Sequence, residues 1–406
     1  MQLIQKGILA PKGFMATGEH IGVKKVKKDL ALIYSEAKCT YAGAFTLNQV
    51  KAAPVLWDQK VLVQKTAVHG VVINSGNANA VTGEVGYQNT EVMAQAFAQV
   101  KGMKKEEVLV CSTGVIGVQL PMDVIEPGIK VAAEKLTSEP QGATDAAQAI
   151  LTTDTFAKEI AIEEVIEGVT IRIGGIGKGS GMIHPNMATM LAFITTDVNI
   201  TQALLQRALN TCVNTTLNMI TVDGDTSTND SVIVLANGRA GIACITEESE
   251  AYTIFTKALK EVLKYIAISI VRDGEGATKL LEVEIQNTQS FERGKRLAKS
   301  ILTSNLVKTA FFGEDANWGR ILAAMGYAGE TFETEQVTLE IESAMGKMTL
   351  LKKGEPVKFS EVKAKRILEE TEIKILVEMA EGVEVVNAWG CDLSYDYVKI
   401  NGEYRS

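Results

Sequence analysis

Histidine and closely spaced cysteine are scarce in this chain of 406 residues. Its three histidines, His20, His69 and His184, stand far apart, and no two of its five cysteines form a C-x-x-C pair. Structural zinc sites and zinc hydrolases need such residues in clusters, so the sequence predicts no metal site. The scattered cysteines also argue against a disulfide framework. We therefore expect any enzyme built from this chain to work without a histidine base or a tightly held transition metal.

Long apolar runs and an excess of positive charge are lacking as well. No apolar run approaches the about 18 residues that crossing a bilayer requires, and the first residues contain no convincing signal-peptide core or cleavage site. The chain carries 41 Lys and Arg against 49 Asp and Glu, a net charge of −8. A mildly acidic chain without a long basic run binds nucleic acid and anionic membranes poorly. We predict a cytoplasmic protein with neither kind of partner.

Short runs rich in β-branched residues alternate with helical segments, which indicates a mixed α and β protein. A hydrophobic fraction of 46% and a charged fraction of 22% are typical of globular chains. The predicted strands span Leu30–Ser35, Val71–Asn74, Val108–Cys111, Val169–Ile173, Met190–Thr195 and Ser231–Ala236. The predicted helices span Tyr87–Val100, Pro127–Leu136, Thr144–Leu151, Thr201–Met219 and Glu248–Val271. Short alternating strands from Val337 to Val377 predict a smaller C-terminal unit, and no low-complexity linker divides the chain.

Many of the 35 glycines gather in polar loops that follow an apolar run or a helix. These loops comprise residues 74–79, 112–117, 174–181, 223–230 and 273–276. Glycine permits tight turns and a close approach of the backbone to a ligand, and loops at strand ends often carry function. Any one of these loops alone is most simply an ordinary turn. Five of them in one fold favour a functional role for the set.

Two of these loops resemble known ligand-binding motifs, a phosphate-binding loop and a calcium loop, but neither matches its motif. Gly177-Lys178 resembles the end of a phosphate-binding loop, but that pattern needs Gly where Arg172 stands and Ser or Thr where Gly179 stands. The acidic loop from Asp223 resembles a calcium loop, but it lacks Gly at its sixth position and Glu at its twelfth. The sequence therefore predicts neither nucleotide phosphate binding nor calcium binding at these loops.

Thr189 is the first hydroxyl residue of the predicted strand that follows the loop of residues 178–185. A threonine at this position becomes a nucleophile if its own α-amine is freed, because a neutral amine with a pKa of about 8 can serve as its base. Freeing it requires scission of the Ala188–Thr189 peptide bond, which the hydroxyl could perform by attacking the preceding carbonyl. From spacing alone, a buried strand residue is the simpler interpretation of Thr189.

The run His184-Pro-Asn-Met-Ala-Thr-Met-Leu191 closely resembles the processing site of the ornithine acetyltransferase family of arginine biosynthesis. The resemblance covers essentially the whole chain, in the order of the family. Further matching motifs lie at residues 10–14, 74–79, 111–114, 152–155, 223–230, 272–276, 313–320 and 397–406. So many ordered motifs at similar spacing make the resemblance highly specific.

The resemblance implies a fold and a processing event. The fold would be a four-layer α/β/β/α sandwich of the self-processing N-terminal-nucleophile type, with a smaller C-terminal α/β lobe over residues 280–406 or so. Autocatalytic cleavage between Ala188 and Thr189 would give an α chain of residues 1–188 and a β chain of residues 189–406. Both would remain together in a heterotetramer of two α and two β chains.

The implied activity is acetyl transfer by a ping-pong mechanism. Thr189 would take the acetyl group from N2-acetylornithine, release ornithine and pass the group to L-glutamate, which gives N-acetylglutamate. The family places the oxyanion donors at Thr113 and Gly114. Its substrate-binding positions correspond to Thr155, Lys178, Thr189, Glu275, Asn401 and Ser406. Many members also accept acetyl-CoA as donor, and no residue decides whether this multifunctional behaviour applies here; no cofactor is implied.

Within this set, Lys178 could hold a substrate carboxylate as a point charge, and Glu275 could accept hydrogen bonds from an ammonium group. Taken alone, either residue would be read as a solvated loop charge.

Two other functions remain open at this point. A self-processing amidase or aminopeptidase of the same broad type would release its acyl group to water, without needing glutamate. A non-catalytic amino-acid-binding protein would keep an intact chain of 43.7 kDa, whereas a processed enzyme would give two fragments split before Thr189.

Overall fold

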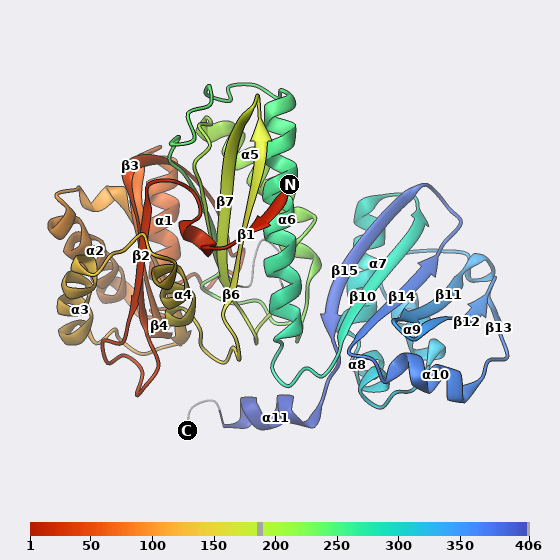
Figure 1. Ribbon diagram of the computed structural model, residues 1–406. Coiled ribbons are helices and arrows are strands. Elements are labelled where there is room, and N and C mark those ends of the chain that lie inside the picture. The colour runs from red at the N-terminus through yellow and green to blue at the C-terminus, as the bar shows by residue number, and fades with distance from the viewer. Residues whose placement is uncertain (185–189, 404–406) are drawn as a thin grey trace. The chain divides into compact units, whose positions relative to one another are not determined.

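The computed structural model describes residues 1–184 and 190–403, which form two compact units (Figure 1). Unit 1 comprises Met1–Gly179, Pro185–Asn218 and Thr226–Ile270. Unit 2 comprises Ser180–His184, Met219–Asp225 and Val271–Ser406. The units therefore interleave along the sequence, and short stretches before and after residues 185–218 belong to the smaller unit.

The described part of unit 1 contains one nine-stranded sheet, in which β2 pairs with β3 beside the path β1-β6-β7-β8-β9-β3-β4-β5. Its strands are β1 (Gln2–Ile4), β2 (Phe14–Glu19), β3 (Leu30–Phe45), β4 (Val68–Asn77), β5 (Val108–Val115), β6 (Lys158–Ile166), β7 (Val169–Lys178), β8 (Leu191–Thr196) and β9 (Ser231–Ala236). The first part of the long strand β3 pairs with β2 and β4, and its last part pairs with β9. Strand β3 thus joins two halves of the sheet.

Helices cover the two halves of this sheet. They are α1 (Ala53–Val63), α2 (Gly83–Lys101), α3 (Met122–Glu134), α4 (Pro140–Ala149), α5 (Gln202–Asn214) and α6 (Glu250–Arg272), with short 3-10 turns at Gly7–Leu9, Lys105–Glu107 and Leu217–Met219. Figure 1 shows α2 and α3 on one side of the strands and α5 and α6 on the other.

Strand β7 illustrates how the layers form. A Cβ atom at Gly175 would lie 2.9 Å from Val262 of α6, so this face of the strand packs directly on that helix. Because successive residues of a strand face opposite ways, Ile176 points away from α6. It belongs to a core cluster that also includes Val71 and Leu109 of the other half-sheet. Helix, half-sheet, half-sheet and helix therefore form four layers, which confirms the fold that the resemblance implied.

Unit 2 holds a six-stranded sheet in the order β13-β12-β11-β14-β10-β15. Its strands are β10 (Leu280–Thr288), β11 (Thr338–Ser343), β12 (Gly346–Lys352), β13 (Glu355–Pro356), β14 (Glu372–Glu378) and β15 (Glu384–Cys391). Its helices are α7 (Phe291–Thr303), α8 (Asn305–Phe312), α9 (Trp318–Gly326), α10 (Glu361–Leu368) and α11 (Tyr395–Gly402), with a 3-10 turn at Thr334–Gln336. This smaller mixed unit agrees with the predicted C-terminal lobe.

Several predicted elements differ from the structure, among them the strand predicted over Leu30–Ser35, which continues to Phe45 as β3. The predicted strand Val169–Ile173 continues to Lys178, because the glycines that suggested a loop give α6 room to approach the sheet. The predicted helix at Pro127 begins at Met122, so proline lies inside it rather than at its first position. The predicted helix Thr201–Met219 ends at Asn214. Beyond that end, Thr216 Oγ1 donates to the carbonyl of Cys212 at 2.6 Å, a local bond that competes with helix continuation.

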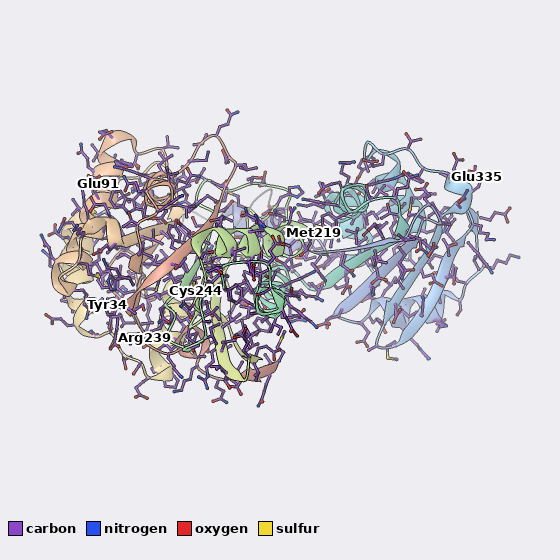
Figure 2. All side chains as sticks on the ribbon, turned by 90° about the horizontal axis from the view of Figure 1, so that it is seen from above. Tyr34, Glu91, Met219, Arg239, Cys244 and Glu335 are labelled. Atoms are coloured by element: carbon purple, nitrogen blue, oxygen red, sulfur yellow. The ribbon has the colours of Figure 1, made fainter. Side chains whose placement is uncertain are left out.

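All five cysteines are free thiols. Cys244, labelled in Figure 2, is exposed and the other four are buried. Within the described ranges, no helix combines the length and the apolar character that a bilayer span requires.

Candidate active site

Thr113 and Gly114 lie at the end of β5, beside the end of the parallel strand β4. Gly114 pairs with Gly76, and the register shifts at the next residue of β4. Gly114 has a φ of +135°, and a Cβ atom there would overlap the backbone of Gly76. Side chains are therefore excluded at Gly114 on steric grounds.

Buried polar side chains fix the position of this end of β5. Ser112 Oγ donates to Asn74 Oδ1 at 2.6 Å. Asn229 Nδ2 donates to the carbonyls of Ser112 at 2.8 Å and Ala78 at 2.5 Å. Because these groups are buried and bonded to one another, they fix the backbone of β5 at Ser112, next to Thr113 and Gly114. Hydrogen-bond donors for an oxyanion need such support.

Lys178 is the last residue of β7 and is buried. It pairs with Leu191, the first residue of β8 and the second residue after Thr189. Its Nζ lies 3.9 Å from Oδ2 of Asp154, a buried residue to which the sequence analysis gave no role. The structure thus connects the predicted ligand Lys178 to the motif of residues 152–155.

Asp154 organises this part of unit 1. Its carboxylate accepts hydrogen bonds from Lys158 Nζ at 2.8 Å, from the N–H of Gly179 at 2.7 Å and from the N–H of Thr152 at 3.0 Å. Burial alone would raise the pKa of Asp154, but the positive charges of Lys178 and Lys158, together with these hydrogen bonds, hold it well below its usual range. Thr155, the predicted ligand in the same motif, is exposed.

Lys24 is a second residue of this region to which the sequence analysis gave no role. Its Nζ donates to the carbonyls of Leu151 and Lys28, both at 2.7 Å, so it holds the chain just before residue 152. Burial lowers the pKa of Lys24 to about 8, despite the nearby carboxylate of Asp29. Lys158 and Lys178 therefore share the carboxylate of Asp154, while Lys24 lies near the carboxylates of both Asp29 and Asp154. Only its long-range contact with Leu151 identifies Lys24, since nothing in the local sequence sets it apart from its neighbouring lysines.

Breaking this buried ion pair should destabilise the protein. Asp154→Asn leaves the buried Lys158 charge without its 2.8 Å partner, so we expect a loss of about 3–5 kcal/mol in the free energy of unfolding, measured by urea titration. Glu126→Gln is the matched control, because it breaks the exposed pair with Lys130 and should cost about 0–1 kcal/mol. Equal losses in both variants would contradict the assigned role of Asp154.

In unit 2 the structure brings Glu275 and Asn401 together. Glu275 is buried, and Asn401 Nδ2 of helix α11 donates to its Oε2 at 2.7 Å. The N–H of Glu275 donates to the carbonyl of Ser180 at 2.9 Å. A Cβ atom at Gly181 would overlap the Glu275 carboxylate, so a side chain there would displace that carboxylate. The two predicted ligands thus form one polar contact.

Three predicted site residues, Ala188, Thr189 and Ser406, lie outside the described residues. The residue after Thr189 is described: Met190 is buried, and its carbonyl accepts a hydrogen bond from the N–H of Ser231 at 3.0 Å. Among the residues that the structure places, no three His, Cys, Asp or Glu side chains gather as a metal site. The absence of a metal and of a cofactor stays a prediction.

Comparison with known proteins decides the family. The model of the ArgJ family matches residues 15–406. The chain belongs to the ArgJ family. Among its relatives, the arginine biosynthesis bifunctional protein ArgJ of Caldanaerobacter subterraneus subsp. tengcongensis is 51% identical over 406 residues, which cover all of both chains. The protein of the same name from Bacillus subtilis is 47% identical over 399 residues, 98% of this chain and 96% of that one.

Two solved structures each match part of the chain. The arginine biosynthesis bifunctional protein ArgJ from Bacillus halodurans is 40% identical, covers 46% of this chain and 97% of its own, and has a TM-score of 0.45. The ornithine acetyltransferase from Mycobacterium tuberculosis, solved with ornithine, is 39% identical, covers 47% and 98%, and has a TM-score of 0.43. The ArgJ assignment confirms the family predicted from the sequence, and with it the prediction of an acetyltransferase.

Proposed function

We propose that this chain transfers the acetyl group of N2-acetylornithine to L-glutamate through an acetyl-Thr189 intermediate, producing ornithine and N-acetylglutamate. One observation carries the proposal: the chain is 51% identical, over its whole length, to a bifunctional ArgJ protein of arginine biosynthesis. Membership of the family makes this chain an enzyme that acts on small molecules. The mechanism and the residue roles below are our proposals.

The proposed chemistry begins with the free α-amine of Thr189, which takes the proton of its own hydroxyl. The Oγ atom then attacks the acetyl carbonyl, and the resulting oxyanion accepts hydrogen bonds from Thr113 and Gly114. Collapse of this intermediate expels the ornithine amine with a proton. The α-amine of glutamate attacks the acetyl ester by the reverse steps, which frees Thr189. Glutamate must outcompete water for the ester, so water has to be kept from the site.

The charges of unit 1 suit carboxylate-bearing substrates. Lys158 and Lys178 share one carboxylate, that of Asp154, so their two positive charges exceed its single negative charge. We assign Lys178 to a substrate carboxylate. In unit 2 the contact between Glu275 and Asn401 supports an assignment to a substrate ammonium group. Thr155 and Ser406 complete the proposed set through their hydroxyl groups.

The proposal includes processing and assembly. We propose self-cleavage between Ala188 and Thr189 into chains of residues 1–188 and 189–406, which remain associated as two α and two β chains in the cytoplasm. The relatives named above are called bifunctional, which favours acetyl-CoA as a second acetyl donor. No bound cofactor is part of the proposal.

The deciding experiment incubates the purified protein with N2-acetylornithine, with and without glutamate, and measures ornithine, N-acetylglutamate and acetate. We expect ornithine and N-acetylglutamate in equal amounts, and only with glutamate present. Acetate release without glutamate would instead identify an amidase. No turnover together with one intact 43.7 kDa chain would favour a binding protein. Repeating the assay with acetyl-CoA tests the second donor.

Removing the chain end should weaken substrate binding. Deletion of residues 401–406 removes the Asn401 amide that bonds to Glu275 at 2.7 Å. A hydrogen bond to a charged group contributes about 1.5–3 kcal/mol, so we expect KM to rise roughly 10- to 100-fold in steady-state assays. Deletion of residues 404–406 alone separates the contribution of the last residues from that of Asn401. Unchanged kinetics in the longer deletion would contradict the assignment.

A further inference from the structure

The described residues just before the proposed cleavage bond are held by one short stretch of unit 2. The N–H of Val222 donates to the carbonyl of Ile183 at 2.7 Å, and Thr221 Oγ1 donates to the same carbonyl at 3.2 Å. His184 Nδ1 lies 3.0 Å from Thr221 Oγ1. Burial, with the charges of nearby lysines, lowers the pKa of His184 to about 4, so this imidazole is neutral at pH 7.

Asp223 makes the principal contacts with this segment. Its Oδ2 accepts the N–H of Met182 at 2.6 Å, and its Oδ1 accepts the N–H of Ile183 at 2.8 Å. Two consecutive backbone N–H groups therefore point at one carboxylate. Hydrogen bonds with an ionised partner are the stronger kind, so this is the firmest attachment of the segment.

Met182 has an unusual backbone conformation at this point. Its φ is +54°, in the left-handed region, and its side chain is exposed. A residue with a Cβ atom pays about 1–2 kcal/mol for this conformation relative to the right-handed one. The exposure of 42% at Met182 leaves its side chain only partly packed against other residues. The hydrogen bonds from the N–H groups of Met182 and Ile183 to Asp223 help to offset the cost of this conformation.

Asp223 is itself fixed by its neighbours. Lys308 Nζ, fully buried on α8, donates to the carbonyls of Val222 at 2.7 Å and Cys391 at 2.5 Å. The hydroxyl of Tyr397 on α11 lies 3.4 Å from Asp223 Oδ2. Burial and the nearby carboxylates raise the pKa of Tyr397, so its hydroxyl keeps its proton and donates. Tyr397 of α11 thus contacts the Asp223 carboxylate directly, and Lys308 fixes the backbone of the preceding residue, Val222.

We propose that Asp223 is a positioning residue for self-cleavage, which fixes Met182 and Ile183 and so directs the chain that leads to the Ala188–Thr189 bond. This inference rests on the proposed function. In the cleavage, Thr189 Oγ bonds to the carbonyl carbon of Ala188, the C–N bond breaks and the hydroxyl proton passes to the nitrogen. Water then hydrolyses the ester, leaving a carboxylate on Ala188 and the hydroxyl and free amine of Thr189. An intramolecular attack of this kind depends steeply on orientation.

The test follows the appearance of the two fragments over time after purification, by denaturing gel and intact mass. In Asp223→Asn we expect the first-order rate of cleavage to fall about 10- to 100-fold, because a charge-assisted acceptor is lost. Asp225→Asn is the matched control: it makes the same change two residues later, on an exposed side chain, and its rate should stay within about twofold of the original. Cleavage of Asp223→Asn at the original rate overturns the inference.

A second variant separates positioning from general stability. Met182→Gly removes the cost of the left-handed conformation, so adding it to Asp223→Asn should recover at least part of the lost rate. A folded double variant that cleaves no faster than Asp223→Asn overturns the inference. If Asp223→Asn does not fold, the double variant decides alone: a folded double variant that cleaves supports positioning, and an uncleaved or unfolded one contradicts it. An uncleaved wild-type chain would instead contradict the proposed function itself.

Discussion

Thr189→Ala is expected to leave a single chain of 43.7 kDa and to abolish acetyl transfer. The methyl group of alanine has no lone pair to attack either the Ala188 carbonyl or an acetyl group, so both steps of the proposal fail together. Loss of a nucleophile of this kind typically lowers kcat by about 10⁴-fold or more. Intact-mass spectrometry measures the splitting, and the glutamate-dependent assay measures the transfer.

Two controls accompany this variant. Thr189→Ser keeps a hydroxyl and should still split and transfer at a reduced rate. Thr211→Ala makes the same change on the exposed surface of α5 and should leave both processes intact. Acetyl transfer retained by Thr189→Ala would remove Thr189 from the mechanism, and splitting retained by it would place the cleavage chemistry elsewhere.

Thr113→Val should lower kcat by about 10²–10³, the usual cost of losing one oxyanion donor, with little change in KM. Valine replaces the hydroxyl with a methyl group of similar size, so the end of β5 should keep its shape. The oxyanion forms in both half-reactions, so pre-steady-state acetylation by acetylornithine and deacetylation by glutamate should both slow. Rapid-quench measurements of each half-reaction provide the check.

Gly114→Ala is a second variant at the proposed oxyanion site, to be compared with Thr113→Val. A Cβ atom at Gly114 overlaps the backbone of Gly76, and the φ of +135° disfavours any side chain. This variant should therefore lose thermal stability as well as activity, whereas Thr113→Val should keep the original Tm. A fully active Thr113→Val protein would exclude the Thr113 hydroxyl as an oxyanion donor, while leaving the Gly114 N–H open to that role.

The local sequence pattern predicted many helices and strands of the fold correctly, but some predictions were wrong. The predicted strand Ser231–Ala236 has the bounds of β9, because its apolar run ends at clear polar residues. The glycines of residues 174–177 suggested a loop, yet they lie in β7. Glycine is locally ambiguous, since it serves both flexible turns and close packing. The structure explains why glycine stands at position 175 of this strand: a Cβ atom there would lie 2.9 Å from Val262 of α6.

Some residues of the candidate site could be predicted from the sequence, and others were identified only in the structure. Contiguous sequence motifs can be recognised without a structure. Such motifs contain Thr113, Gly114, Lys178 and Glu275. Asp154 lay within a recognised motif, but its role depends on the bond from Gly179, 25 residues later. Lys24 contacts Leu151 across 127 residues, and Asp223 contacts Met182 across 41. None of these partners is implied by spacing.

By itself, the sequence determined the family, the mixed α and β class and the chemical groups from which a nucleophile and its donors could come. These properties lie in the order and identity of neighbouring residues. The tertiary structure alone decided which carboxylate neutralises which lysine, which glycine has no room for a side chain, and which acceptor holds the left-handed turn at Met182. Buried polar groups must find partners wherever the fold brings them, and the fold brings together residues that the sequence keeps far apart.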